Sequence, residues 1–119
     1  MNQPTASKPP YQCTENRDFG PAKIEHRTAG CGLNELGSYF MVFHDESLSE
    51  PWTVEYEETI FVIEGQARLR VVEDGTERRL TGEPGELIVL PKGTTLRYGA
   101  RRDTRLLLSI SPVNWRERQ

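Results

Sequence analysis

The sequence predicts an all-β domain, built as a sandwich or barrel of short antiparallel strands. Three observations favour this class. Short apolar segments alternate with turn residues from about residue 22 onward, no segment has a sustained helical period, and the chain holds 10 glycines and 8 prolines. With 119 residues the chain has room for one hydrophobic core. We therefore predict a single domain over residues 21–119.

The first 20 residues differ from this pattern. Prolines at positions 4, 9 and 10, spaced by polar residues, oppose helices and central strands alike. We interpret residues 1–20 as an N-terminal proline-rich arm. The opening residues lack the apolar core of a secretory signal, which predicts a cytoplasmic protein. No apolar run approaches the roughly 20 residues of a spanning helix, which argues against membrane insertion.

Short runs of β-forming residues bounded by turn residues mark the strands that follow the arm. We expect them at Lys23–Ala29, Ser38–His44, Trp52–Glu57, Thr59–Ile63, Ala67–Glu73, Thr76–Leu80, Leu87–Leu90, Thr94–Tyr98 and Arg105–Ile110. The dipeptide Asp74-Gly75 predicts a tight hairpin, because both residues tolerate positive φ angles. The last strand is apolar almost throughout, which favours a central place in its sheet.

Charge and cysteine content exclude several classes of function. Fifteen Lys and Arg against 18 Asp and Glu give a net charge of −3, which argues against binding to nucleic acid. The two cysteines, Cys13 and Cys31, have no partner at zinc-site spacing, and a cytosolic setting disfavours a disulfide.

Two segments each join an apolar strand to a glycine turn. In the first, six residues separate Glu58 from Gly65; in the second, five residues separate Gly85 from Pro91-Lys92-Gly93. Together they resemble the two motifs of the cupin superfamily (RmlC-like), over Pro51 to about Ala100. The resemblance implies a single-domain cupin, which is a double-stranded β-helix or jelly-roll barrel.

The cupin pattern also implies where metal ligands belong. Its first two histidines fall at Trp52 and Val54, or at Pro51 and Thr53 with the longer spacing, and its third falls at Leu96, so Glu58 is the sole usual ligand that remains. One carboxylate cannot hold a divalent metal, because such sites need three or four converging donors. We therefore expect no metal and no other cofactor.

Two histidines elsewhere leave one alternative open. His44 ends a predicted strand, and a metal site rebuilt around His44 and Glu58 would make the protein a metallo-cupin. His26 is the weaker candidate. Alternation along the strand does not settle which face looks into the barrel.

A narrower resemblance covers about residues 38–115. The segments Pro51–Glu58, Leu90–Thr94 and Ser111–Trp115 are similar to ethanolamine-utilisation cupins of the EutQ type. An acetate kinase-like activity is ascribed to that family, so the resemblance implies action on a small organic acid or acyl phosphate without the usual cupin metal. The chain has no GxxxxGK[ST] phosphate cradle, and Lys92 is typical of a solvated turn residue.

Alternation from Trp52 to Glu58 predicts one inward face that carries an acid and a phenol. The candidate catalytic residues are Glu58 and Tyr56, in a ligand pocket lined by Trp52, Val54, Phe40, Leu96 and Tyr98. Because desolvation disfavours the charged form, we expect Glu58 to be protonated or to share a proton with Tyr56.

Several functions fit such a pocket. The protein could transform a small-molecule ligand, or it could be a non-catalytic cupin that senses a ligand or has a structural role. We also expect a homodimer, because cupins of this size commonly pair through their sheets.

Overall fold

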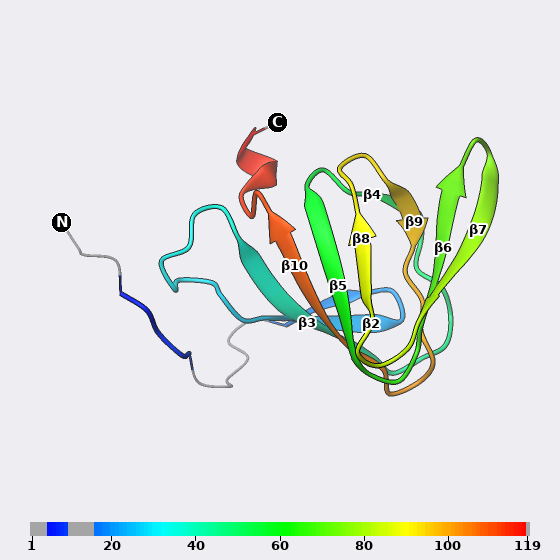
Figure 1. Ribbon diagram of the computed structural model, residues 1–119, viewed down its shortest axis with the longest axis horizontal. Coiled ribbons are helices and arrows are strands. Elements are labelled where there is room, and N and C mark those ends of the chain that lie inside the picture. Colours follow the sequence, from blue (N-terminus) through cyan, green and yellow to red (C-terminus); the bar gives the residue numbers. More distant parts are fainter. Residues whose placement is uncertain (1–4, 10–15, 119) are drawn as a thin grey trace.

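The computed structural model describes residues 5–9 and 16–118. The described chain forms a six-stranded antiparallel sheet in the order β1-β2-β3-β10-β5-β8 and a four-stranded sheet in the order β4-β9-β6-β7. The two sheets face one another across the core (Figure 1), which confirms the all-β prediction. The elements are β1 (Asn16–Phe19), β2 (Ala22–His26), β3 (Gly37–Phe43), β4 (Trp52–Thr53), β5 (Glu57–Glu64), β6 (Ala67–Glu73), β7 (Thr76–Gly82), β8 (Leu87–Leu90), β9 (Thr95–Arg97), β10 (Arg105–Ser111) and a 3-10 helix, η1 (Trp115–Arg118).

The last strand, β10, occupies the middle of the six-stranded sheet, as its apolar sequence predicted. It pairs with β3 on one side and with β5 on the other. Leu106, Leu108 and Ile110 are buried and point into the barrel, whereas Leu107 lies on the other face of the strand. This alternation sets the inward face of both neighbouring strands through the register of the sheet.

Two turns contain a glycine whose backbone has a positive φ angle. Asp74 and Gly75 join β6 to β7 with φ angles of 51° and 79°, so the predicted hairpin is confirmed. Gly65, at φ +89°, follows β5 where the chain passes against Thr104. A Cβ atom at Gly65 would lie 2.2 Å from the Thr104 hydroxyl and 2.6 Å from its Cα, so no side chain fits there.

One predicted strand is split by a change of sheet. Trp52–Thr53 belongs to the four-stranded sheet, and the next strand, Glu57–Glu64, belongs to the six-stranded sheet. Val54 still exchanges backbone hydrogen bonds with Thr94 and Gly93, at 2.9 and 2.8 Å, before the chain crosses over. The expected strand Trp52–Glu57 is therefore interrupted at residues 54–56, where the chain bends, and Glu57 belongs to β5.

The structure adds elements at both ends of the domain. Asn16–Phe19, inside the range predicted as an arm, forms the edge strand β1 and pairs with β2. Near the other end, Trp115–Arg118 forms η1, which is too short to show a helical period in the sequence. The rest of the arm prediction falls largely on residues 1–4 and 10–15, which lie outside the described residues, as does Cys13. Cys31 is a free thiol.

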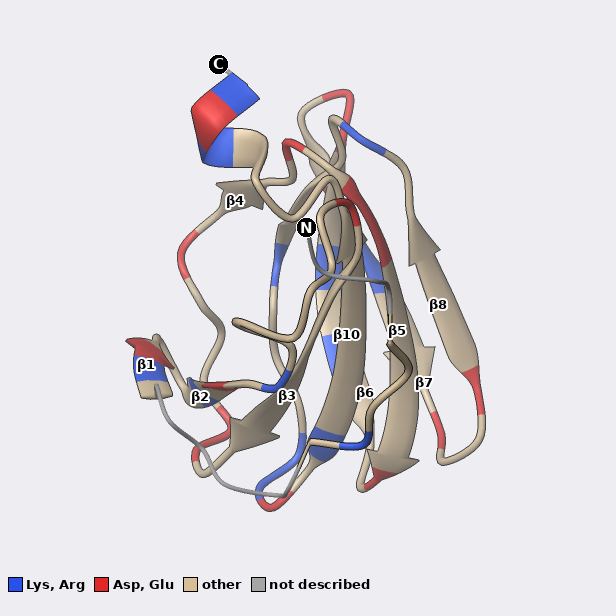
Figure 2. Cartoon of the chain, turned by 90° about the vertical axis from the view of Figure 1, so that its left-hand side faces the viewer, with Lys and Arg blue, Asp and Glu red and all other residues tan. Residues whose placement is uncertain are grey.

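The outer face of the six-stranded sheet carries exposed apolar side chains beside its edge. Phe61 and Ile63 on β5 are 39% and 38% exposed, and Leu87 and Val89 on the edge strand β8 are 58% and 63% exposed. Phe61 lies directly opposite Leu87 in the register. Figure 2 shows β8 without a charged residue along its length.

Within the described residues, no helix has the length and apolar character needed to cross a bilayer.

Candidate functional site

A pocket of about 590 Å³ opens into the barrel at the C-terminal end of the chain. We call it the barrel pocket. Strands β1, β2, β3 and β10 form one side, and residues 113–117 with the start of η1 form another. Four predicted site residues also line it: Trp52, Tyr56, Glu58 and Tyr98. The volume lies within the range usual for small-molecule sites, which is about 300–1,000 Å³.

Glu58 is the buried acid of the pocket. It is the second residue of β5, between Ile110 of β10 and Leu90 of β8, and its exposed fraction is 2%. The Tyr98 hydroxyl donates a hydrogen bond to Glu58 Oε1 at 2.6 Å. The other oxygen, Oε2, is buried and has no hydrogen-bond partner among the described residues. Burial raises the pKa of Glu58 from 4.5 to about 7, although the hydrogen bond from Tyr98 lowers the pKa in part.

The two phenols near Glu58 have different roles. Tyr98 holds the carboxyl, whereas the Tyr56 oxygen accepts a hydrogen bond from Trp52 Nε1 at 3.0 Å. The phenol that bonds Glu58 is therefore Tyr98, which follows the end of β9, and not Tyr56, which was named in the sequence analysis as the possible partner. Burial and the nearby Glu58 raise the pKa of Tyr56 to about 12 and raise the pKa of Tyr98 well above 10. Both phenols are thus hydrogen-bond donors at neutral pH.

Aromatic rings form a continuous wall beside the acid. Phe19 meets Trp52 and Tyr98 edge to face, with centroids 5.6 and 5.5 Å apart. Trp115 meets Trp52 at 6.1 Å and Tyr56 at 5.3 Å. Trp115 belongs to the tail segment on which the family resemblance rests, but its place in the pocket was not predicted. Phe19 was missed because it lies in the range interpreted as an arm.

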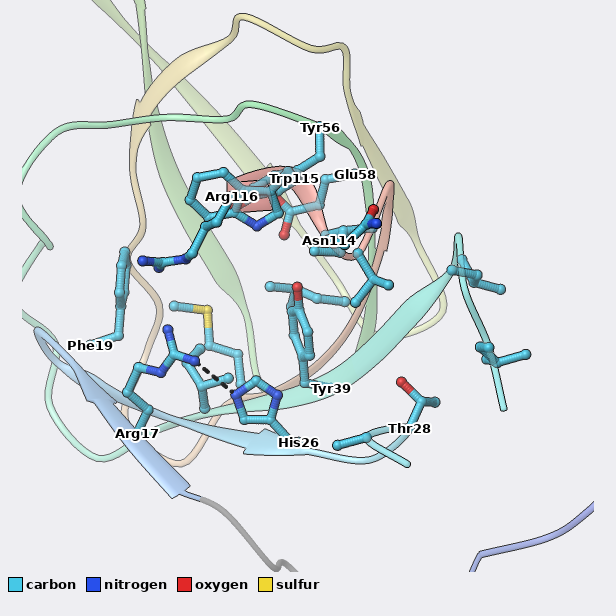
Figure 3. A pocket seen from close by; sticks show the side chains of 18 of the residues that line it. Arg17, Phe19, His26, Thr28, Tyr39, Tyr56, Glu58, Asn114, Trp115 and Arg116 are labelled. Carbon is cyan, nitrogen blue, oxygen red and sulfur yellow. Dashed lines mark hydrogen bonds between the residues drawn. The ribbon is translucent and has the colours of Figure 1, made fainter. Parts of the chain in front are cut away.

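Two arginines, Arg17 and Arg116, lie at one side of the pocket, with their guanidinium groups near Phe19 (Figure 3). Arg17 Nη2 lies 3.3 Å from His26 Nε2. Since arginine has no acceptor, the guanidinium donates and the imidazole nitrogen accepts. Arg116 lies over the Trp115 ring at 4.5 Å from the centroid.

Tyr39 projects into the pocket toward Glu58, with the two arginines to one side of it (Figure 3). Burial raises the pKa of Tyr39 above its usual value, with Tyr56 and Glu58 adding to the rise and Arg17 and Arg116 opposing it. The hydroxyl therefore stays protonated and can donate. Sequence reasoning missed this residue.

Three residues predicted for the pocket do not line it. Val54 and Leu96 are fully buried in the core, outside the pocket wall. Phe40 is on the other face of β3, where it contacts the guanidinium groups of Arg27 and Arg105 at 5.7 and 5.3 Å. The placement of Phe40 in the pocket is wrong, because its partner in the register is the outward-facing residue 107.

The side chains in the barrel do not fit a divalent metal. Among the residues that the structure describes, no group of three or more His, Cys, Asp or Glu side chains lies close enough to hold one. His44 is exposed after the end of β3, whereas Glu58 is buried inside the barrel. His26 lines the pocket, where its ring packs against Tyr39 at 5.2 Å.

The sequence is similar to one protein family and to several curated proteins. Residues 28–117 match the family described as Ethanolamine utilisation protein EutQ. The acetate kinase EutQ of Clostridioides difficile is 29% identical over 86 residues, which is 72% of this chain and 46% of that protein. The acetate kinase EutQ of Salmonella typhimurium is 31% identical over 65 residues, which is 55% of this chain and 27% of that protein. The chain thus spans less than half of these relatives.

Solved structures show the same fold. The EutQ protein of Clostridium difficile superposes with a TM-score of 0.64 at 24% identity, covering 84% of this chain and 78% of that one. Oxalate decarboxylase from Bacillus subtilis gives a TM-score of 0.74 at 20% identity, covering 95% of this chain and 31% of that one. These likenesses, together with the two antiparallel sheets, confirm the predicted cupin barrel.

Proposed function

This chain belongs to the ethanolamine utilisation protein EutQ family, and on that premise we propose that it binds a small organic acid or acyl phosphate in the barrel pocket without a metal. The observation that carries the proposal is the pair formed by Glu58 and Tyr98. A buried carboxyl with one oxygen unpartnered, at the wall of a pocket of about 590 Å³, is costly to keep unless it has a use. Arg17 and Arg116 add positive charge at the same pocket.

Glu58 supplies the chemistry that such a ligand needs. With a pKa of about 7, the carboxyl exists in both protonation states near neutral pH. It can donate to a ligand oxygen when protonated and accept a proton when ionised. Acetate attacks a phosphoryl group as the anion and gives up no proton, so the role open to Glu58 in that transfer is donation from its protonated form to a phosphoryl oxygen. Two relatives are named acetate kinase, so phosphoryl transfer to a carboxylate is the reaction to test first.

The experiment combines binding and turnover. Isothermal titration calorimetry measures binding of carboxylates and acetyl phosphate to the parent and to Glu58→Gln, and a coupled assay measures acetyl phosphate formed from acetate and ATP. We expect Glu58→Gln to retain binding within a few fold and to lose turnover. Glu55→Gln changes an exposed acid three residues away and serves as the matched control.

The possible outcomes distinguish an enzyme from a non-catalytic binding module. Binding without turnover in the parent would make the protein a non-catalytic binding module. Equal turnover in the parent and Glu58→Gln would remove Glu58 from the chemistry. If no carboxylate and no acyl phosphate shows saturable binding to the parent, the proposed function is wrong.

A further inference from the structure

The two ends of the barrel pocket differ in chemistry. Arg17 of β1 lies opposite Ile24 of β2 in the register, whereas Thr28 follows the end of β2. From Ile24 to the end of β2 at His26 the strand rises about 7 Å, and Thr28 lies two residues further along the chain. Figure 3 shows Arg17 and Arg116 together on one side of the pocket and Thr28 on the other, with Tyr39 between them.

The end with the arginines is built for an anion. Neither Arg17 nor Arg116 forms an ion pair with a carboxylate among the described residues. Glu117 also borders the pocket but forms no ion pair with either of them in that part of the chain. A planar guanidinium matches the geometry of carboxylate and phosphate groups, and the protonated Tyr39 hydroxyl offers a further donor.

The other end carries aliphatic side chains beside the polar residues Thr28 and Asn114 (Figure 3). Leu33 and Leu36, in the loop between β2 and β3, line the pocket although they are 49% and 48% exposed. The backbone N–H of Val113 donates to the Glu35 carbonyl at 2.8 Å, which holds this loop beside the C-terminal segment. Val113 also lines the pocket, so three aliphatic side chains border the same end. Their exposed surface would be covered by an apolar ligand body.

The size of the pocket argues against acetate as its full occupant. Acetate occupies about as much space as two water molecules in the liquid, roughly 60 Å³. It would fill only a small part of about 590 Å³.

Resting on the proposed function, we propose that the barrel pocket is selective for organic anions with an extended apolar body. The anionic head binds Arg17 and Arg116, and the body lies along the pocket against Leu33, Leu36 and Val113.

The test is isothermal titration calorimetry of the full chain with acetate, butanoate and hexanoate. Each buried methylene should tighten binding about fourfold, so hexanoate should bind about two orders of magnitude more tightly than acetate. Hexanol, which has the body without the anion, should bind at least about tenfold more weakly than hexanoate, because it makes no charge-assisted contact with the guanidinium groups.

Two variant proteins test where the head and the body of the ligand bind, and a third serves as the control. A protein with both Leu33→Ser and Leu36→Ser should keep the dissociation constant of acetate and lose most of the gain with chain length. Arg116→Gln should weaken all three carboxylates by a common factor. Leu48→Ser, at a leucine that is 41% exposed and does not line the pocket, is the control and should change nothing.

The failures are distinguishable. If acetate binds in a manner sensitive to Arg116→Gln but affinity does not rise with chain length, this inference is overturned and the proposed function stands. A rise with chain length that the double serine variant leaves intact would also overturn it, because the body would lie elsewhere. If no carboxylate or acyl phosphate binds at all, the proposed function itself fails.

Discussion

Replacement of Glu58 by glutamine should remove a specific pH dependence of stability. Burial raises the pKa of this carboxyl from 4.5 to about 7. Between these values the folded state holds a proton that the unfolded chain has released, so the free energy of unfolding falls as pH rises. Below the lower value and above the upper one, Glu58 adds no slope. The total change corresponds to about 3 kcal/mol.

Urea unfolding at a series of pH values measures this effect. The free energy of unfolding of the parent minus that of Glu58→Gln cancels the titration of all other groups. We expect this difference to fall by about 2–3 kcal/mol between pH 5 and pH 8, with unchanged m-values. Tyr98→Phe supplies a second readout. Since the Tyr98 hydrogen bond lowers the pKa of Glu58, its loss should move the midpoint of the profile to higher pH.

A flat difference would refute the reasoning, because it would mean that Glu58 ionises equally in the folded and unfolded states. A difference that rises with pH would show a carboxylate stabilised in its charged form. In either case, Glu58 would not be the buried acid on which the proposed function rests.

Three further predictions concern metal content, assembly and packing. Protein purified without added metal should contain far less than one equivalent of Fe, Mn, Ni, Cu or Zn by elemental analysis. Near-stoichiometric metal would contradict the conclusion that the side chains in the barrel do not fit a divalent metal. Light scattering should give a homodimer at micromolar concentration. Leu87→Glu or Val89→Glu, on the exposed edge strand β8, should shift the measured mass toward that of the 13.6 kDa monomer. A parent protein that is already monomeric would exclude an interface at this strand. Gly65→Ala should cost about 1–3 kcal/mol of unfolding free energy through its clash with Thr104, whereas Gly75→Ala, at φ +79° with open space around it, should cost less; equal losses would contradict the packing argument.

Several parts of the fold could be predicted from the sequence because they depend on residues adjacent in the chain. The hairpin at Asp74-Gly75 depends on the φ preferences of two adjacent residues, and the central place of β10 depends on the apolar run within it. The inward position of Glu58 follows from the face that it shares with the apolar residues Ile60 and Val62 along its own strand. Each of these features is set by neighbours in the chain, so a single sequence carries them.

Other features depend on which segments meet in space. Alternation divides β3 into two faces but does not say which one looks inward; pairing with β10 turns Tyr39 toward the barrel and Phe40 away from it. The partner of Glu58 is Tyr98, which lies 40 residues away in the sequence, directly after β9 of the opposite sheet.

The polar end of the barrel pocket is the clearest case. Arg17 and Arg116 come from opposite ends of the chain and carry no motif that links them in the sequence. Most of the strands, the hairpin at Asp74-Gly75, the cupin class and one buried acid could be predicted from the sequence, because these follow from period, turn chemistry and a local motif. Only the tertiary structure decided what surrounds that acid, because a pocket is made by contacts between distant segments, and the pairing of the strands sets those contacts.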